Sequence, residues 1–282
     1  MAPTPSKAVL ITGCSSGIGR ATAQRLAKKG WTVYASARRL ESIADLADAG
    51  CETLRLDVTD EDSMRGAVAE VEREHGAVGV LINNAGYSQS GPVEQIDLAA
   101  VRRQFETNVF GLVALTQLVL PKMRDQRWGK VVNIGSMGGR LTFPGGGYYH
   151  ATKHALEAIS DALRFEVRGF GIHTILIEPG LIVTDFGTAA VASMDDVAGG
   201  GPYGEFNTKL AALTEGVYKG PMRHLGGGPD AVARAIERAI SRKRPPARVR
   251  VTASARLAIL NRRLTPDRVW DLAMRAQYPQ PR

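Results

Sequence analysis

The sequence predicts a single doubly wound α/β domain, residues 1–282, with a mostly parallel sheet. Three observations predict it. Short apolar runs alternate with amphipathic helical segments between residues 7 and 184, a glycine-rich loop follows the first run, and polar residues recur where the runs end. Alternation without linkers or internal repeats is typical of β-α-β units. Because parallel strands end at one edge of such a sheet, we expect the polar residues to converge there.

The first strand and the loop after it predict a nucleotide site. Residues 7–12 form an apolar run typical of a buried parallel strand, and Gly13, Gly17 and Gly19 follow before a helix over residues 20–29. This arrangement directs backbone N–H groups and a helix N-terminus toward a diphosphate. A glycine loop is also an ordinary tight turn, so the loop alone does not decide the function.

The second strand, residues 31–37, predicts which dinucleotide binds. It ends at Ala37 and is followed by Arg38 and Arg39. An acidic residue at this position binds the ribose 2′-OH of NAD, whereas an arginine accommodates the 2′-phosphate of NADP. NADP is therefore expected over NAD, the alternative being that the two arginines only begin a solvated helix.

The next strands also end in polar residues. A third strand over residues 53–58 carries Asp57 at its C-terminal end, a polar helix covers residues 60–75, and a fourth strand over residues 78–82 ends in residues 83–86, Asn-Asn-Ala-Gly. Small and amide residues at a strand end let a flat ligand approach closely, although such clusters are also turns. These segments therefore extend the predicted site along the sheet edge.

A long helix over residues 98–124 contains one polar residue, Asn108, inside its apolar stripe. A buried asparagine is costly unless it is hydrogen-bonded, so Asn108 is either a structural clasp or part of the site. A fifth strand over residues 130–136 then ends at Ser136, and a sixth over residues 173–178 follows later.

Tyr149 and Lys153 are the predicted acid/base pair. Apolar residues at helical spacing predict a helix over residues 148–168, on which positions four apart lie one turn apart on one face. A fixed ammonium favours the phenolate and lowers a tyrosine pKa from its usual value of about 10. Tyr149 can then transfer a proton near neutral pH. The alternative is an ordinary surface pair.

The C-terminal third differs from the rest of the chain in its glycine content, its pattern of elements and its charge. Glycine triplets at 199–201 and 226–228 flank a mixed helical stretch, which predicts a mobile lid over residues 185–228. A helix over residues 229–242 and a strand over residues 248–252 come next, and residues 253–282 form a basic extension with two amphipathic segments. Residues 231–282 hold thirteen Arg and Lys against three Asp and Glu, a net charge of +10, whereas the rest of the chain carries −2.

The lid and the loop before Tyr149 predict the substrate. Both are mostly apolar, through Phe186, Val191, Met194, Tyr203, Phe206, Leu210 and Leu213 in the lid and Met137, Leu141 and Phe143 in the loop. Such walls suit a bulky apolar alcohol or ketone, because sugars and short hydroxy acids would leave polar groups unpaired. A steroid-, retinoid- or lipid-like substrate is expected, the alternative being a xenobiotic or aryl ketone.

Other features of the sequence argue against a disulfide framework, a metal site, a signal segment and a membrane span. The two cysteines, Cys14 and Cys51, have no paired spacing, which disfavours a disulfide framework or a zinc site. No apolar signal segment begins the chain, and the longest apolar stretch is too short for a membrane span, so a cytoplasmic protein is expected. His150 and His154 are four apart, but the glutamate of a His-Glu-x-x-His motif is missing. No metal site is therefore expected. Both histidines are predicted to lie on an outer face of the helix, where a subunit contact is one interpretation. Cys14 is predicted to be a small residue that fills space.

Seven motifs occur in the order and spacing of one known family. They are Thr12 to Gly19, Asp57-Val58, Asn83 to Gly86, Asn108, Ser136, Tyr149-x-x-x-Lys153, and Pro179-Gly180 with Thr184. Over residues 7–184 this set resembles the short-chain dehydrogenase/reductase family, and within it the hydroxysteroid and retinol dehydrogenase branch. The resemblance implies a Rossmann fold, NADP(H)-dependent interconversion of an alcohol and a ketone or aldehyde, and a homodimer or homotetramer.

The resemblance also implies residue roles. Tyr149 exchanges the proton, Lys153 lowers its pKa and holds the nicotinamide ribose, Ser136 bonds the substrate oxygen, and Asn108 fixes a water linked to Lys153. The remaining implied cofactor residues are Gly13, Ser15, Ser16, Gly17, Ile18, Gly19, Arg38, Arg39, Asp57, Val58, Asn84, Ala85, Gly86, Pro179, Gly180 and Thr184. Two rival hypotheses stay open. One is a catalytically idle dinucleotide sensor; the other is a protein whose basic extension contacts a membrane surface or nucleic acid, although that extension lacks a recognised nucleic-acid motif.

Overall fold

The computed structural model describes residues 4–194, 201–220 and 224–281 and contains a seven-stranded parallel sheet in the order β3-β2-β1-β4-β5-β6-β7. This order, with β1 and β4 side by side at its centre, is that of a doubly wound Rossmann sheet, as the sequence predicts. The strands are β1 Val9–Ile11, β2 Val33–Ala37, β3 Glu52–Arg55, β4 Val80–Asn83, β5 Gly129–Ile134, β6 Ile172–Pro179 and β7 Arg248–Val251.

Helices cover both faces of the sheet. One face packs against α1 Gly17–Lys28, α8 Pro229–Ile240 and the short helix η1 Leu40–Leu46. The opposite face packs against α2 Glu61–His75, α4 Gly111–Asp125 and α5 Gly147–Glu166. Each central strand is buried on both sides, which is why its sequence is a continuous apolar run and not an alternating one.

The long helix predicted over residues 98–124 is three elements. An α-helix, α3 Leu98–Phe105, is followed by a π-helical turn, η2 Glu106–Phe110, and then by α4. The wide turn contains Asn108, whose side chain hydrogen-bonds the backbone of Tyr87. A π-turn inserts one extra residue into the helix and is common at functional sites. Apolar periodicity of the sequence did not predict it.

Two predicted strands extend too far. The strand predicted over residues 53–58 ends at Arg55, because the Asp57 carboxylate accepts hydrogen bonds from the backbone N and the hydroxyl of Thr59 at 2.9 and 2.8 Å and starts a turn. The strand predicted over residues 130–136 ends at Ile134, and Ser136 caps the short helix η3 Met137–Gly139. Both side chains still follow a strand end.

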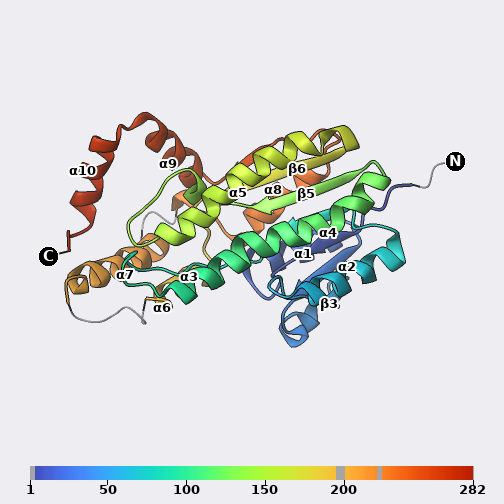
Figure 1. Cartoon of the computed structure of the whole chain (residues 1–282), viewed down its shortest axis with the longest axis horizontal. Helices are drawn as coiled ribbons and strands as arrows, with labels where there is room; N and C mark the ends of the chain where they lie inside the picture. Colours follow the sequence, from blue (N-terminus) through green and yellow to red (C-terminus); the bar gives the residue numbers. More distant parts are fainter. Residues whose placement is uncertain (1–3, 195–200, 221–223, 282) are drawn as a thin grey trace.

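The C-terminal helices gather at one end of the molecule, the end away from the N-terminus (Figure 1). They are α6 Asp185–Ala192, α7 Gly204–Lys219, α9 Ala253–Leu264 and α10 Asp267–Gln277; a short helix, η4 Arg168–Phe170, precedes β6. Gly199 and Gly200 of the predicted hinge lie outside the described residues, as does the side chain of Val191. Within the described ranges, every helix is too short or too polar to cross a bilayer.

Candidate active site

Hydrogen bonds join the glycine loop to the end of β4. The buried Thr12 hydroxyl accepts from the backbone N of Asn84 and of Ala85, both at 3.0 Å. The Asn84 amide nitrogen donates in return to the carbonyls of Thr12 and Gly13 at 2.9 and 3.0 Å. Hydrogen bonds thus join the ends of β1 and β4, and the Asn84 side chain binds the backbone of the glycine loop itself. Thr12 lies inside a predicted motif, but its role in joining the two strands did not follow from the sequence.

The glycine loop fits a dinucleotide diphosphate. Gly13 and Gly17 have positive φ angles of 71° and 56°, and a Cβ at Gly19 would clash with the Gly13 carbonyl oxygen. Ser15 and Ser16 are exposed; Ser16 is the N-cap of α1 but makes no side-chain cap bond, and the first turn of α1 holds no acidic residue. The loop therefore leaves room and free N–H donors for an anion at the helix N-terminus. Ile18, also in this turn, is partly buried against the core.

The predicted adenosine residues lie at the ends of β2 and β3. Arg38 and Arg39 are exposed directly after the buried Ala37, and neither guanidinium forms an ion pair within the described ranges. Asp57 is partly exposed, whereas Val58 is buried, with its carbonyl against Gly111. The arginine side chains thus remain available to an anionic group.

Asn108 is a clasp. Its Nδ2 donates to Tyr87 O at 2.8 Å and to Thr152 Oγ1 at 3.2 Å, and its Oδ1 accepts from Tyr87 N at 3.1 Å. A Cβ at Gly86 would lie 3.1 Å from Asn108 Oδ1. The asparagine thus joins the segment after β4 to α5, the helix of Tyr149, and the water that the resemblance implies stays a prediction.

Lys153 is almost completely buried beneath Tyr149. Its Nζ donates to the Ile134 carbonyl at 2.9 Å and lies 5.7 Å from the centroid of the Tyr149 ring. Burial lowers the pKa of Lys153 to about 8, since removing an ammonium from water disfavours its charged form. The Tyr149 ring also lies 5.4 Å from the ring of Phe186 on α6. The predicted acid/base pair therefore faces the first helix of the predicted lid.

Within the described residues, the Ser136 hydroxyl accepts one hydrogen bond and donates none. Its Oγ accepts a hydrogen bond from Gly138 N at 3.0 Å, which uses a lone pair and not the O–H. The hydroxyl hydrogen can then be donated to a ligand oxygen.

The prediction that His150 lies on an outer helix face is wrong. The side chain is 8% exposed, its Nδ1 lies 3.0 Å from Gly138 O, and its ring packs against those of Phe143 and Tyr149. Burial lowers the pKa of His150 to about 4. A helix turn alone did not reveal that the Gly138 loop folds over this ring. His154 is exposed, as expected, and Cys14 is a buried thiol whose pKa burial raises to about 12, which suits a space-filling residue.

The segment after β6 closes the site. Thr184 lies against the glycine loop, where a Cβ at Gly17 would be 3.5 Å from its methyl group. Pro179 ends β6, and a Cβ at Gly180 would clash with the Ser254 hydroxyl at the start of α9. Ser254 Oγ also accepts from Leu181 N at 3.0 Å. The first turn of the basic extension is thereby fixed beside the site.

A partly buried charge cluster, which the sequence did not predict, lies one turn beyond Lys153 on α5. Arg248 on β7 donates to the carboxylates of Glu157 at 2.9 Å and Asp161 at 2.6 Å. Burial, then the adjacent Glu178 carboxyl, raises the pKa of Glu157 to about 7. The cluster joins the site helix to the edge of the sheet.

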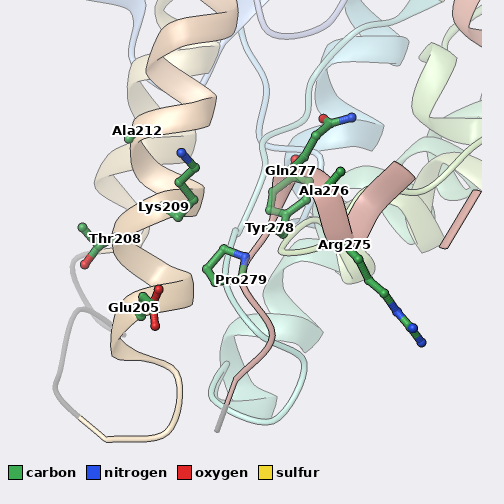
Figure 2. Close-up of a pocket in the computed structure, with 9 residues that line it drawn as sticks. All are labelled: Glu205, Thr208, Lys209, Ala212, Arg275, Ala276, Gln277, Tyr278 and Pro279. Atoms are coloured by element: carbon green, nitrogen blue, oxygen red, sulfur yellow. The ribbon is translucent and has the colours of Figure 1, made fainter. Parts of the chain in front are cut away.

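A cavity of about 550 Å³ lies between α7 and the C-terminal tail (Figure 2). None of its lining residues is a predicted catalytic or cofactor residue; they are Glu205, Thr208, Lys209, Ala212, Arg275, Ala276, Gln277, Tyr278 and Pro279. Within the described part of the chain, no group of three or more His, Cys, Asp or Glu side chains is arranged to hold a metal ion.

Comparison with known proteins decides the family. Residues 7–195 match the family model described as short chain dehydrogenase. The chain belongs to the short-chain dehydrogenase/reductase family. It is therefore an oxidoreductase, and the ordered motifs of the sequence are those of this family. The narrower assignment to the hydroxysteroid and retinol dehydrogenase branch stays a prediction.

Three similar proteins match nearly the whole chain. The 3-ketodihydrosphingosine reductase of Bacteroides thetaiotaomicron is 35% identical, with 96% of this chain and 97% of that protein covered. The NADPH-dependent 3-dehydrocapnine reductase of Ornithobacterium rhinotracheale is 35% identical, with 93% and 94% covered. A solved short-chain dehydrogenase from Streptomyces avermitilis is 34% identical, with a TM-score of 0.78 and coverage of 98% and 97%.

Proposed function

We propose that this protein is an NADP(H)-dependent oxidoreductase that interconverts an alcohol and a ketone or aldehyde on a bulky apolar substrate. The observation that carries the proposal is the Tyr149 phenol, whose ring lies 5.7 Å from the buried ammonium of Lys153, together with the Ser136 hydroxyl on the turn that is hydrogen-bonded to the same helix. These are the groups that proton transfer to or from a substrate oxygen requires.

Each side chain then has one task. Tyr149 gives its phenolic proton to the carbonyl oxygen in reduction and receives it in oxidation. Lys153 stabilises the phenolate through its charge, which it carries below pH about 8. Ser136 donates its hydroxyl hydrogen to the same substrate oxygen and stabilises the charge that develops there. Asn108 holds the Tyr87 segment against α5 and so keeps the floor of the site in place.

The cofactor proposed is NADP. A bound nicotinamide dinucleotide would supply or accept the hydride. Its diphosphate would lie on the loop from Gly13 to Gly19, and its 2′-phosphate would pair with Arg38 and Arg39, which no acidic side chain of the described chain neutralises. The similar Ornithobacterium reductase is NADPH-dependent by name, which supports this choice over NAD. Asp57, Val58, Asn84 to Gly86, Lys153, Pro179, Gly180 and Thr184 are proposed to line its remaining parts.

The substrate proposed is steroid-, retinoid- or lipid-like. Phe186 and Phe143 flank the Tyr149–His150 segment, and Leu210 of α7 packs against the loop at Gly145. Residues 185–228 are therefore proposed as an apolar lid. The name of the Bacteroides relative denotes a ketone on a sphingoid base, which supports a lipid-like ketone. Xenobiotic or aryl ketones would use the same walls.

The remaining partners proposed are a second copy of the chain and a membrane surface. Phe110 and Phe165, 55% and 84% exposed, are side chains that a homodimer or homotetramer would cover. On α9 and α10, five exposed apolar side chains alternate with exposed arginines, which suits an anionic bilayer better than nucleic acid; the five are Leu257, Leu260, Leu264, Val269 and Leu272. Light scattering and sedimentation with anionic vesicles test these two contacts.

One screen tests the reaction. Steroid ketones, retinal, long-chain keto bases, aryl ketones and short sugars are each mixed with the protein and NADPH or NADH. The corresponding alcohols and short hydroxy acids are mixed with NADP or NAD, and the nicotinamide absorbance is followed in every case. We expect the highest kcat/KM for a long or polycyclic apolar ketone with NADPH. Sugars or hydroxy acids as best substrates would contradict the apolar site. Cofactor binding without turnover of any carbonyl or alcohol would favour the idle sensor.

A further inference from the structure

We propose that His150 is a positioning residue of the proposed reaction: its imidazole holds the turn that carries Ser136 against the helix that carries Tyr149. The proposal rests on the function proposed above and assigns no contact between His150 and substrate. It starts from an imidazole that is 8% exposed and adjacent in sequence to the proposed acid/base.

Two hydrogen bonds connect Ser136 to His150 through a single residue. Gly138 N donates to Ser136 Oγ at 3.0 Å, and Gly138 O lies 3.0 Å from His150 Nδ1. A carbonyl oxygen only accepts, so Nδ1 carries the hydrogen and donates it. The Ser136 hydroxyl, the Gly138 backbone and the first turn of α5 therefore form one hydrogen-bonded unit.

Two glycines shape the space around the ring. A Cβ at Gly138 would clash with His150 Nδ1, and a Cβ at Gly146 would lie 2.7 Å from Nε2. The imidazole is thus held edge-on between the Ser136 turn and the start of α5. The Phe143 and Tyr149 rings, 6.1 and 5.7 Å away by their centroids, close its other sides. A planar side chain with a donor at the position of Nδ1 fits this space and keeps the bond to Gly138 O.

The imidazole stays neutral while it does this. Burial lowers the pKa of His150 to about 4, although the bond to the Gly138 carbonyl acts in the opposite direction. His154 on the next turn of α5 is the other titratable group that disfavours its protonation. The contact with Gly138 O needs a hydrogen on Nδ1, which this neutral tautomer carries and a protonated imidazole would also carry, so the contact does not switch with pH.

The contact between His150 and Gly138 matters because the hydroxyls of Ser136 and Tyr149 must both reach one substrate oxygen. In the proposed reaction, the Ser136 and Tyr149 hydroxyls point to the same substrate atom from different segments, a loop after β5 and a helix. Donors aimed at a developing charge act only when they lie about 3 Å from it, and displacement by about 1 Å lowers rates on the order of a hundredfold. His150 is the side chain of α5 that hydrogen-bonds the Gly138 backbone, and Lys153 joins the same helix to the end of β5.

Matched variants of His150 distinguish the loss of its hydrogen bond to Gly138 from the loss of its side-chain volume. In His150→Asn the amide nitrogen can lie where Nδ1 lies and still donate to Gly138 O, whereas His150→Leu fills a similar volume with no donor. We expect His150→Leu to lower kcat about tenfold to a hundredfold, with the Kd for NADPH within about twofold of wild type. His150→Asn should recover most of kcat, and the exposed His154→Leu should behave as wild type. A loss caused only by poorer packing would not be rescued by asparagine.

A second measurement needs no turnover. Hydrogen exchange of the Gly138 amide, read by NMR in the substrate-free protein, should be faster by about tenfold in His150→Leu and unchanged in His150→Asn. If His150→Leu does not fold, His150→Gln takes its place, because its amide aligns with Nε2 and not with Nδ1. Unchanged exchange and kcat in the non-donor variant, or an asparagine variant as slow as leucine, overturns the proposal. A wild-type protein inactive on every ketone overturns the proposed function instead, while the exchange result still decides whether His150 holds the turn.

Discussion

Lys153 Nζ lies 5.7 Å from the centre of the Tyr149 ring while it donates to the Ile134 carbonyl at 2.9 Å. The ammonium is thus fixed by the end of β5 and not by the tyrosine it accompanies. Because burial lowers the pKa of Lys153 to about 8, its charge can be lost at mildly alkaline pH. The electrostatic support of the Tyr149 phenolate is then strongest below that pH.

Tyr149→Phe should reduce turnover by about 100-fold or more, because it removes the transferable proton and keeps the ring. Binding of NADPH, measured by fluorescence titration, should survive. The neighbouring Tyr148 is the matched control: its hydroxyl donates to Val93 O at 3.2 Å, away from Lys153, so Tyr148→Phe should retain kcat. Wild-type turnover by Tyr149→Phe would refute the assignment of the acid/base.

Ala37→Asp combined with Arg38→Leu should shift cofactor preference from NADP toward NAD. The change removes a charge-assisted contact with the 2′-phosphate worth about 1.5–3 kcal/mol and supplies a carboxylate for the 2′-OH. The ratio of kcat/KM for NADPH and NADH measures it. Arg65→Leu, an exposed arginine paired with Glu61 on α2, serves as control and should leave the ratio unchanged. Equal kcat/KM for both cofactors in the wild type would contradict the arginine interpretation.

Arg248→Met should destabilise the fold by about 2–3 kcal/mol near pH 8, because the buried Glu157 carboxylate loses its nearer cation and keeps only the half-exposed Arg140 at 3.5 Å. Urea unfolding measures the change. The loss should shrink below pH 6, where Glu157, whose pKa is raised to about 7, is protonated. Arg234→Met removes an exposed pair with Asp230 on α8 and should cost under about 0.5 kcal/mol. Equal losses of unfolding free energy in the two variants would show that the partly buried cluster stabilises the fold no more than an exposed ion pair does.

Acid should weaken the protein through His150. Above pH about 6.5 the histidine is neutral in both the folded and the unfolded chain. Between pH about 6.5 and about 4, the histidine takes up a proton in the unfolded chain but not in the folded one. The free energy of unfolding should fall over this window by on the order of 3 kcal/mol. Glu157 has the opposite slope between pH 4.5 and about 7, since its folded pKa is raised. The difference between wild type and His150→Asn isolates the histidine, and a difference independent of pH would contradict its buried neutral state.

Local pattern in the sequence determined most of the fold. The apolar runs predicted the central strands within a few residues, because a strand buried on both faces is apolar along most of its length. The edge strands β3 and β7 are only partly buried, and polar residues alternate with apolar ones in them. The glycine spacing predicted a loop whose positive φ angles at Gly13 and Gly17 only glycine adopts freely. Helical spacing placed Tyr149 and Lys153 on one face, and the order of motifs indicated the family. These features depend on neighbours in the chain.

Contacts between distant segments decided the rest. Asn108 reaches Tyr87 through a π-turn, His150 is buried by the Gly138 loop, and Glu157 meets an arginine ninety-one residues away. No local period encodes such partners, since burial and hydrogen bonding of a polar side chain are set by whichever backbone folds over it. The sequence alone therefore determined which residues lie at the sheet edge. Only the tertiary structure decided which of these side chains are bound by neighbouring residues and which can bind a ligand. The physical reason is that the free energy of each buried polar group depends on the partner that packing brings to it.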